Sequence, residues 1–179
     1  MSEQVVLITG ALTGIGRATA IAFAKEGAKV VVSGRHTDEG QKLAAELRTL
    51  GANAEFVQAD VRRENDVQNL VDQTVSRFGR LDAAVNNAGT EGKPGPFTNQ
   101  TAESYAATFD TNVLGTLLSM KHELRVMLPQ SQGSIINVLL STLAASTQWR
   151  DSPKQRLLNS PTPESESMLS LPAQSRPEC

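Results

Sequence analysis

An α/β fold, built on a parallel sheet with helices on both faces, is the architecture that this sequence predicts. Short apolar segments alternate along the chain with longer segments whose apolar residues recur at helical spacing. Gly27, Gly51 and Gly79 follow three of the longer segments, and glycine is favoured where a helix ends. Strands that are apolar along their whole length need cover on both sides, which the connecting helices of a parallel sheet provide.

The first part of the chain contains three strand–helix units. In chain order they are a strand at residues 4–9, a helix at 15–26, a strand at 29–33, a helix from Thr37 or Asp38 to Leu50, a strand at 55–59 and a helix at 64–78. Each predicted strand is short and mostly apolar, as buried strands are. The apolar stripe predicted for the first helix consists of Ile15, Ala18, Ile21 and Ala22.

The middle of the chain adds two more strands and a long helix. Residues 81–86 form the fourth predicted strand, and a loop rich in glycine and proline follows it. One continuous helix is expected from about residue 102 to residue 128, with His122 on its solvated face. Residues 134–138 form the fifth predicted strand, so the sheet is expected to have about five strands.

The composition changes near residue 140. All 13 glycines lie at or before Gly133, whereas five of the eight prolines lie beyond residue 150. A folded α/β unit uses glycine to end its helices, and residues 134–179 contain none. We therefore expect a folded domain at residues 1–140 and a different tail at residues 141–179, disordered after about residue 145.

Charge and cysteine content exclude several classes of partner and site. The 17 basic and 19 acidic residues are balanced without a basic run, which argues against nucleic acid and anionic membranes. No segment has the roughly 18 apolar residues of a membrane span, and the N-terminus lacks the pattern of a signal peptide. The single cysteine, Cys179, fits a reducing cytoplasm. His36 and His122 lack the neighbouring ligands of a metal site, so none is expected.

The glycine-rich segment after the first strand is the main candidate for ligand binding. Residues 9–16 read Thr-Gly-Ala-Leu-Thr-Gly-Ile-Gly, between a buried strand and the start of a helix. Glycines allow the backbone to approach a ligand, and the helix N-terminus offers free N–H groups and the positive end of a dipole. A nucleotide phosphate is therefore expected here. The alternative is a tight turn without a ligand.

The ends of the next strands suggest which nucleotide binds. After the second strand, where a carboxylate would bind the ribose hydroxyls of NAD, this chain has Gly34 and Arg35. A guanidinium pairs well with a 2′-phosphate, so NADP is favoured and NAD remains possible; the alternative is a solvated arginine. Asp60, followed by Val61, could accept from the adenine amino group or cap the helix that begins near Glu64.

A third polar segment, Asn-Asn-Ala-Gly at residues 86–89, follows the fourth strand. The carboxyl ends of parallel strands form the edge at which doubly wound folds bind their ligands. Taken alone, the tetrapeptide would be an ordinary turn.

Together these segments resemble the short-chain dehydrogenase/reductase family. The glycine turn, Asp60, residues 86–89, Asn112 and the fifth strand all match its motifs in register over about residues 3–138. The resemblance implies a Rossmann-type doubly wound sheet, normally seven-stranded, homo-oligomeric assembly, and hydride transfer between NAD(P) and a small alcohol or carbonyl substrate. It assigns Asn112 to the catalytic tetrad. It assigns cofactor binding to Gly10, Leu12, Thr13, Gly14, Ile15, Gly16, Arg35, Asp60, Val61, Asn87, Ala88 and Gly89.

The rest of the family's catalytic set does not match. Its serine position falls at Leu139 and Leu140, and Ser141 comes one residue late, on the opposite face of an extended strand. No tyrosine follows Tyr105, and the positions of the family's Tyr-x-x-x-Lys hold Pro153 and Leu157. Loss of one positioned acid–base group costs about 10²–10⁴ in rate, so little or no turnover is expected.

The family's sixth and seventh strands and its interface helix also have no counterpart here. The fifth strand is therefore predicted to be an unpaired edge, with Leu114, Leu117 and Leu118 partly uncovered.

Three hypotheses follow. The chain is a family enzyme whose C-terminal half was lost or misread, for instance through a frameshift. Alternatively, it is a non-catalytic protein that binds NADP through Gly10, Gly14, Gly16 and Arg35, or a truncated remnant that does not fold.

Overall fold

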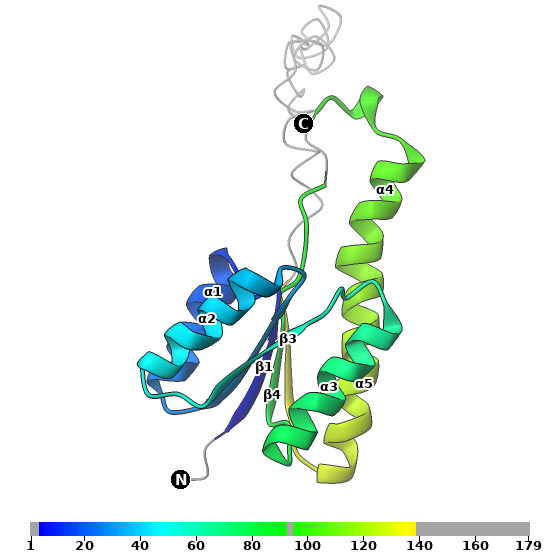
Figure 1. Cartoon of the computed structure of the whole chain (residues 1–179). Coiled ribbons are helices and arrows are strands. Elements are labelled where there is room, and N and C mark those ends of the chain that lie inside the picture. The colour runs from blue at the N-terminus through cyan, green and yellow to red at the C-terminus, as the bar shows by residue number, and fades with distance from the viewer. Residues whose placement is uncertain (1–3, 93–94, 139–179) are drawn as a thin grey trace, which may run out of the picture.

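The computed structural model describes residues 4–92 and 95–138, which form one parallel five-stranded sheet flanked by helices (Figure 1). The strand order is β3-β2-β1-β4-β5. From β1 the chain adds β2 and β3 on one side of the sheet, and it then adds β4 and β5 on the other side. This arrangement confirms the predicted α/β fold with a doubly wound parallel sheet. Leu139, Leu140 and the tail at residues 141–179, predicted to be disordered after about residue 145, lie outside the described residues.

The elements lie close to the predicted ranges. The strands are β1 (Val5–Thr9), β2 (Lys29–Gly34), β3 (Ala54–Gln58), β4 (Ala83–Asn86) and β5 (Ser134–Asn137). The helical elements are α1 (Gly14–Lys25), α2 (Thr37–Thr49), α3 (Glu64–Phe78), the short 3-10 helix η1 (Phe97–Asn99), α4 (Ala102–Phe109), the π-helix η2 (Asp110–Leu114) and α5 (Gly115–Gln130). Within the described residues, no helix is both long and apolar enough to cross a membrane.

Alternate residues of the central strands face two separate cores, one on each side of the sheet. Ile8 and Val32 pack with residues of α1 and α2, whereas Leu7 and Val31 pack with residues of α3 and α5. Figure 1 shows the same division, with α1 and α2 on one side of the sheet and α3 and α5 on the other. This period-2 alternation is what a strand covered on both faces requires.

The buried face of α1 differs from the prediction. It consists of Gly16, Ala20 and Ala24, whereas Ile15 of the predicted stripe is 60% exposed. Of the other stripe residues, Ala18 and Ala22 are exposed as well, and Ile21 is half-buried. The reason is close packing: a Cβ atom on Gly16 would lie 2.4 Å from the side-chain nitrogen of Asn87. Small residues bring this helix close to the sheet.

The single long helix predicted at residues 102–128 is interrupted by a π-helical segment. α4 continues into η2 and then into α5 without leaving the helical backbone region, because Asp110 and Gly115 both have right-handed helical angles. A π-turn adds one residue to a helix, which a 3.6-residue period in the sequence does not reveal. Gly115 lies at the junction, where an added Cβ would be 2.7 Å from the side chain of Val61.

Two predictions about α5 are wrong. His122 is buried and not solvated, because α5 packs against α3; its Nε2 lies 3.4 Å from the carboxylate of Glu64. Leu118 is buried too, in a small core with Val61 and Val67. Leu114 and Leu117 are exposed, as expected. Among the described strands, β5 pairs only with β4 and so forms an edge of the sheet, as predicted.

Candidate functional site

The carboxyl ends of the strands open into a cleft of about 700 Å³. Four segments supply most of its lining: the turn after β1, the end of β2, the residues after β3 and the residues after β4. The cleft therefore lies where the strand order reverses between β1 and β4, which is the usual position of a ligand in a doubly wound sheet. Its lining residues are Gly10, Leu12, Thr13, Gly14, Ile15, Ser33, Gly34, Arg35, His36, Glu39, Ala59, Asp60, Val61, Arg62, Asn87, Ala88, Gly89, Thr90, Ala107 and Thr111.

Two glycines of the turn after β1 have left-handed backbone angles. Gly10 has φ of 61° and Gly14 has φ of 54°, values that favour glycine. A Cβ atom on Gly10 would lie 2.6 Å from the Cα atom of Ala88, so this glycine lets two backbones touch. A Cβ atom on Gly14 would meet nothing within 4 Å. Gly14 therefore faces open space at the wall of the cleft.

The N-terminus of α1 lacks the anionic side chains found at α2 and α3. Its N-cap residue, Thr13, makes no side-chain capping bond, and its first turn contains no acidic residue. By contrast, α2 and α3 each have two acidic residues in their first turn. Since Thr13, Gly14 and Ile15 line the cleft, the positive end of this helix dipole meets the cleft without a counter-charge from its own first turn.

The segment after β4 is bonded to the glycine turn. The side-chain amide of Asn87 donates to the carbonyl oxygens of Gly10 (2.9 Å) and Thr9 (3.3 Å). In return, the hydroxyl of Thr9 accepts from the backbone N–H groups of Asn87 and Ala88, both at 3.2 Å. These bonds hold two walls of the cleft in a fixed relation.

Asn86, at the end of β4, points away from the cleft into the layer under α5. Its side-chain nitrogen donates to Glu123 Oε2 and to Asn137 Oδ1, both at 3.0 Å. Glu123 is fully buried, and its Oε1 has no partner among the described residues. Burial away from water raises the pKa of Glu123 to about 7, although the bond from Asn86 opposes this shift.

Asn112 lies in η2 and holds the backbone of Thr90. Its Oδ1 accepts from the N–H of Thr90 and its Nδ2 donates to the carbonyl of Thr90, each at 2.8 Å. The carbonyl of Asn112 accepts from the hydroxyl of Thr116 at 2.9 Å. The structure thus places Asn112 behind the cleft wall, and neither Asn112 nor Gly16 is among the residues that line it.

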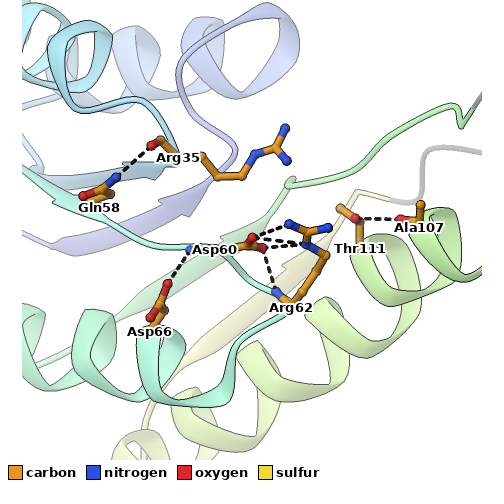
Figure 2. Close-up of polar contacts among 7 residues, drawn as sticks. All are labelled: Arg35, Gln58, Asp60, Arg62, Asp66, Ala107 and Thr111. Atoms are coloured by element: carbon orange, nitrogen blue, oxygen red, sulfur yellow. Dashed lines mark hydrogen bonds and ion pairs between the residues drawn. The ribbon is translucent and has the colours of Figure 1, made fainter.

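The two arginines at the cleft differ in their pairing (Figure 2). Gln58 bonds the carbonyl of Arg35 at 2.9 Å, while the guanidinium of Arg35 makes no ion pair with any described residue. The guanidinium of Arg62 is paired with the carboxylate of Asp60, with Nη2 2.5 Å from Oδ2. This contact lowers the pKa of Asp60 and raises that of Arg62.

The alternative role considered for Asp60, as a cap of α3, is wrong. The N-cap position belongs to Arg63, which makes no side-chain capping bond, and the carboxylate of Asp60 accepts from Arg62 instead. The backbone of Asp60 is fixed from the helix side, since its N–H donates to Asp66 Oδ2 at 3.0 Å.

Sequence reasoning missed several residues of the cleft. Arg62 follows Asp60 by two positions, and this spacing is a sequence signal for a local ion pair. No local pattern indicates that Ala107 and Thr111, from α4 and η2, reach the same cleft. Ser33 also lines it, and its buried hydroxyl has no partner among the described residues. Because an unpaired buried hydroxyl is costly, this atom favours a polar ligand group nearby.

A family model described as short chain dehydrogenase matches residues 4–149. The chain belongs to the short-chain dehydrogenase family. The matched range contains every strand described above and every residue that lines the cleft.

Individual members of the short-chain dehydrogenase family are similar to this chain. Xanthoxin dehydrogenase from Arabidopsis thaliana is 43% identical over 139 residues, covering 75% of this chain and 48% of the relative. (+)-Borneol dehydrogenase 2 from Salvia officinalis is 41% identical over 138 residues, covering 75% of this chain and 48% of the relative. The chain thus spans about half the length of the curated relatives it matches.

A solved structure agrees with the fold. The actinorhodin polyketide ketoreductase variant F189W, solved with NADPH, aligns with a TM-score of 0.72 at 34% identity. The alignment covers 75% of this chain and 52% of that one. The residues described here therefore correspond to about half of a family member.

Proposed function

We propose that this chain binds a nicotinamide dinucleotide, NADP in preference to NAD, in the cleft between β1 and β4. The observation that carries the proposal is the start of α1, where a left-handed glycine turn and a helix N-terminus without acidic residues border the cleft. Such a terminus attracts phosphate through its N–H groups and its dipole. The similar ketoreductase that was solved with NADPH supports this choice of ligand.

The residues of the cleft fit such a cofactor. The backbone of residues 10–16 would hold the pyrophosphate, and the side chain of Arg35 would pair with a 2′-phosphate. Asp60 and Val61 would bind the adenine, while residues 87–89 would border the nicotinamide half. When bound, the nicotinamide ring supplies or accepts a hydride. The unpaired hydroxyl of Ser33 and the open space at Gly14 favour a polar ligand that reaches both places.

We further propose that binding occurs without efficient turnover of an alcohol or carbonyl substrate. The sequence has no tyrosine after Tyr105, and leucines occupy the family's serine positions at residues 139 and 140. Of the catalytic set, only Asn112 has a counterpart, and its side chain is engaged in bonds to Thr90. Proton transfer to or from a substrate oxygen therefore lacks its usual donor.

Titration of the full chain with NADPH and NADH, followed by nicotinamide fluorescence, tests the proposal. We expect saturable binding of both, tighter for NADPH, and no oxidation of NADPH by a panel of small aldehydes and ketones. A sample that melts cooperatively but binds neither cofactor would exclude the binding function. Robust, substrate-dependent oxidation would exclude the second part.

A pair of variants at Gly14 provides a matched control. Asparagine and aspartate both tolerate the left-handed backbone at this position, and a side chain there enters open space. Gly14→Asp adds a negative charge where the phosphate is expected, whereas Gly14→Asn adds similar bulk without charge. Binding should therefore be weaker in the aspartate variant than in the asparagine variant.

A further inference from the structure

Both carboxylate oxygens of Asp60 accept hydrogen bonds from a single residue, Arg62. Its Oδ1 accepts from the backbone N–H of Arg62 at 3.1 Å and from Nε at 2.9 Å. Its Oδ2 accepts from Nε at 3.1 Å and from Nη2 at 2.5 Å. A carboxylate has about four lone-pair sites, and both oxygens already have two contacts each. These contacts come from three N–H groups of Arg62, which together engage both oxygens of Asp60, so a further donor competes with Arg62.

Of the two partners, Arg62 is the one that can move. The backbone of Asp60 is held on both sides, since its N–H donates to Asp66 and its carbonyl accepts from Arg63 at 2.9 Å. The side chain of Asp60 is only 13% exposed, whereas that of Arg62 is 39% exposed. A ligand that needs the carboxylate must therefore displace the guanidinium.

A second carboxylate, that of Asp110, also attracts the guanidinium of Arg62. Asp110, the first residue of η2, attracts Arg62 electrostatically and contributes to its raised pKa. In Figure 2, Arg62 extends toward Thr111 of the same π-helix. Arg62 is thus bonded to Asp60 after β3 and attracted at longer range by Asp110 at the start of η2.

The state of this ion pair decides which purine edge the cleft accepts. The 6-amino group of adenine is a donor and needs an acceptor such as the carboxylate of Asp60. A guanidinium has donors only, so Arg62 in place would suit a 6-oxo purine instead. Arg35 is different, because its guanidinium has no carboxylate partner among the described residues and stays available to a phosphate.

We propose that Arg62 gates the adenine end of the cleft: a nucleotide must displace its guanidinium before Asp60 can accept the 6-amino group. This inference rests on the proposed dinucleotide function and adds a residue that sets its base selectivity. Arg62 acts by competing for Asp60 and is in this sense a specificity-determining residue. Exposed ion pairs contribute about two- to fivefold to an equilibrium constant, which sets the size of the expected effect.

The test measures the affinities of AMP and inosine monophosphate by calorimetry, on the full chain and on Arg62→Met. The two nucleotides have the same phosphate and differ at position 6, so the ratio of their dissociation constants cancels the general loss of positive charge. We expect the preference for AMP over inosine monophosphate to rise about two- to fivefold in Arg62→Met. An unchanged or reduced preference would overturn the gate.

Two further variants sharpen the result. Arg125→Met removes the same charge from an exposed pair with Asp72, away from the cleft, and leaves Asp60 paired, so the AMP preference should stay at the wild-type value. In the double variant Arg62→Met/Asp60→Ala, the gain should disappear because no side-chain acceptor remains at position 60. Persistence of the gain there would overturn the role of Asp60 as acceptor.

Failure of the gate and failure of the proposed function give different results. If wild type binds NADPH but the AMP preference does not change in Arg62→Met, only the gate is excluded. If a cooperatively melting wild type binds neither NADPH nor AMP, the dinucleotide function is excluded, and the gate with it. The side chain of Arg62 is 39% exposed, and the melting transition of each variant checks that its fold is retained.

Discussion

β1 and β5 are both short, parallel partners of β4, yet their surroundings differ. All five residues of β1 are buried, whereas Ser134, Ile136 and Asn137 of β5 are exposed. β1 has a strand on each side and helices on both faces, while among the described residues β5 has only β4 beside it. The comparison teaches that a strand with neighbours on both sides and helices on both faces is fully buried, whereas even Ile136 of the edge strand stays exposed.

The helices show the same contrast. Large apolar side chains are buried on α2 and α3, such as Leu43, Leu47, Leu70 and Val71. The helical stretch from α4 to α5 instead exposes a series of them: Tyr105, Phe109, Val113, Leu114, Leu117, Leu124 and Leu128. α2 and α3 therefore bury large apolar side chains, whereas the stretch from α4 to α5 leaves several of them exposed.

The largest difference between β1 and β5 should appear when one isoleucine of each strand is replaced by alanine. Ile8 in β1 is fully buried, and Ile136 in β5 is 47% exposed. Ile8→Ala should lower the free energy of unfolding by about 2–5 kcal/mol, because it removes core contacts and leaves a cavity. Ile136→Ala should cost less than about 1 kcal/mol. Urea denaturation of both variants measures the difference; equal losses would mean that β5 is covered in solution.

The pH dependence of stability should reveal the buried carboxyl group of Glu123 beside β5. Its pKa is raised from 4.5 to about 7, so the folded state binds the proton more tightly than the unfolded state. This group therefore destabilises the fold as pH rises from about 4.5, and the penalty approaches about 3 kcal/mol above pH 7. Glu123→Gln should lack this loss.

The test compares the free energy of unfolding of wild type with that of Glu123→Gln. This difference is followed as the pH rises from about 5 to about 8. Carboxyl groups with lowered pKa, such as Asp60 and Glu64, act in the opposite direction and cancel in this difference. A difference that does not vary with pH would mean that Glu123 is solvated.

Charge removal at the cleft should affect ligand binding and leave the rest of the molecule unchanged. Arg35→Met should weaken NADPH binding by roughly ten- to a hundredfold, because a charge-assisted contact to the 2′-phosphate is lost. NADH binding should be almost unaffected. Arg125→Met removes the same charge from an exposed pair with Asp72 on the α3–α5 side, and it should change neither affinity. Equal weakening of NADPH and NADH by Arg35→Met would place Arg35 away from the 2′-phosphate.

The smallest predicted effect concerns the caps of two helices. Thr101 caps α4 by accepting from the N–H of Ser104 at 3.2 Å, as part of a capping box, whereas Thr13 makes no such bond at α1. Thr101→Ala should therefore lower the free energy of unfolding by about 1 kcal/mol, and Thr13→Ala by much less. Thermal melting of the two variants checks this; a larger loss for Thr13→Ala would show that α1 is capped in solution.

The regular part of the fold could be predicted from the sequence because its signals are local. α3 begins at Glu64 and ends at Phe78 as predicted, since its apolar period is strong and Gly79 adopts the left-handed cap. The apolar stripe predicted for α1 is wrong because α1 packs on the sheet through small residues, which allow the helix to approach the strands closely. The π-turn at Asn112 and the burial of His122 depend on neighbouring elements, which no local period encodes.

The candidate cleft was predicted in outline for a similar reason. Residues 10, 12–15, 35, 60 and 87–89 each follow a strand, and the carboxyl ends of parallel strands meet at one edge. The pairing of Asp60 with Arg62 was not predicted, because an aspartate at a strand end has several possible partners. Distance in space, rather than in sequence, selects among them.

The bonds from Asn87 to Thr9 and Gly10 join positions 78 and 77 residues apart. During synthesis, the loop after β1 therefore leaves the ribosome long before the side chain that fixes its carbonyls exists. Closing so long a segment has an entropic cost that local helix formation does not repay. A nucleotide added to nascent chains should thus protect them from proteolysis only after the fourth strand has emerged, which makes this chain a natural reporter of when that strand docks.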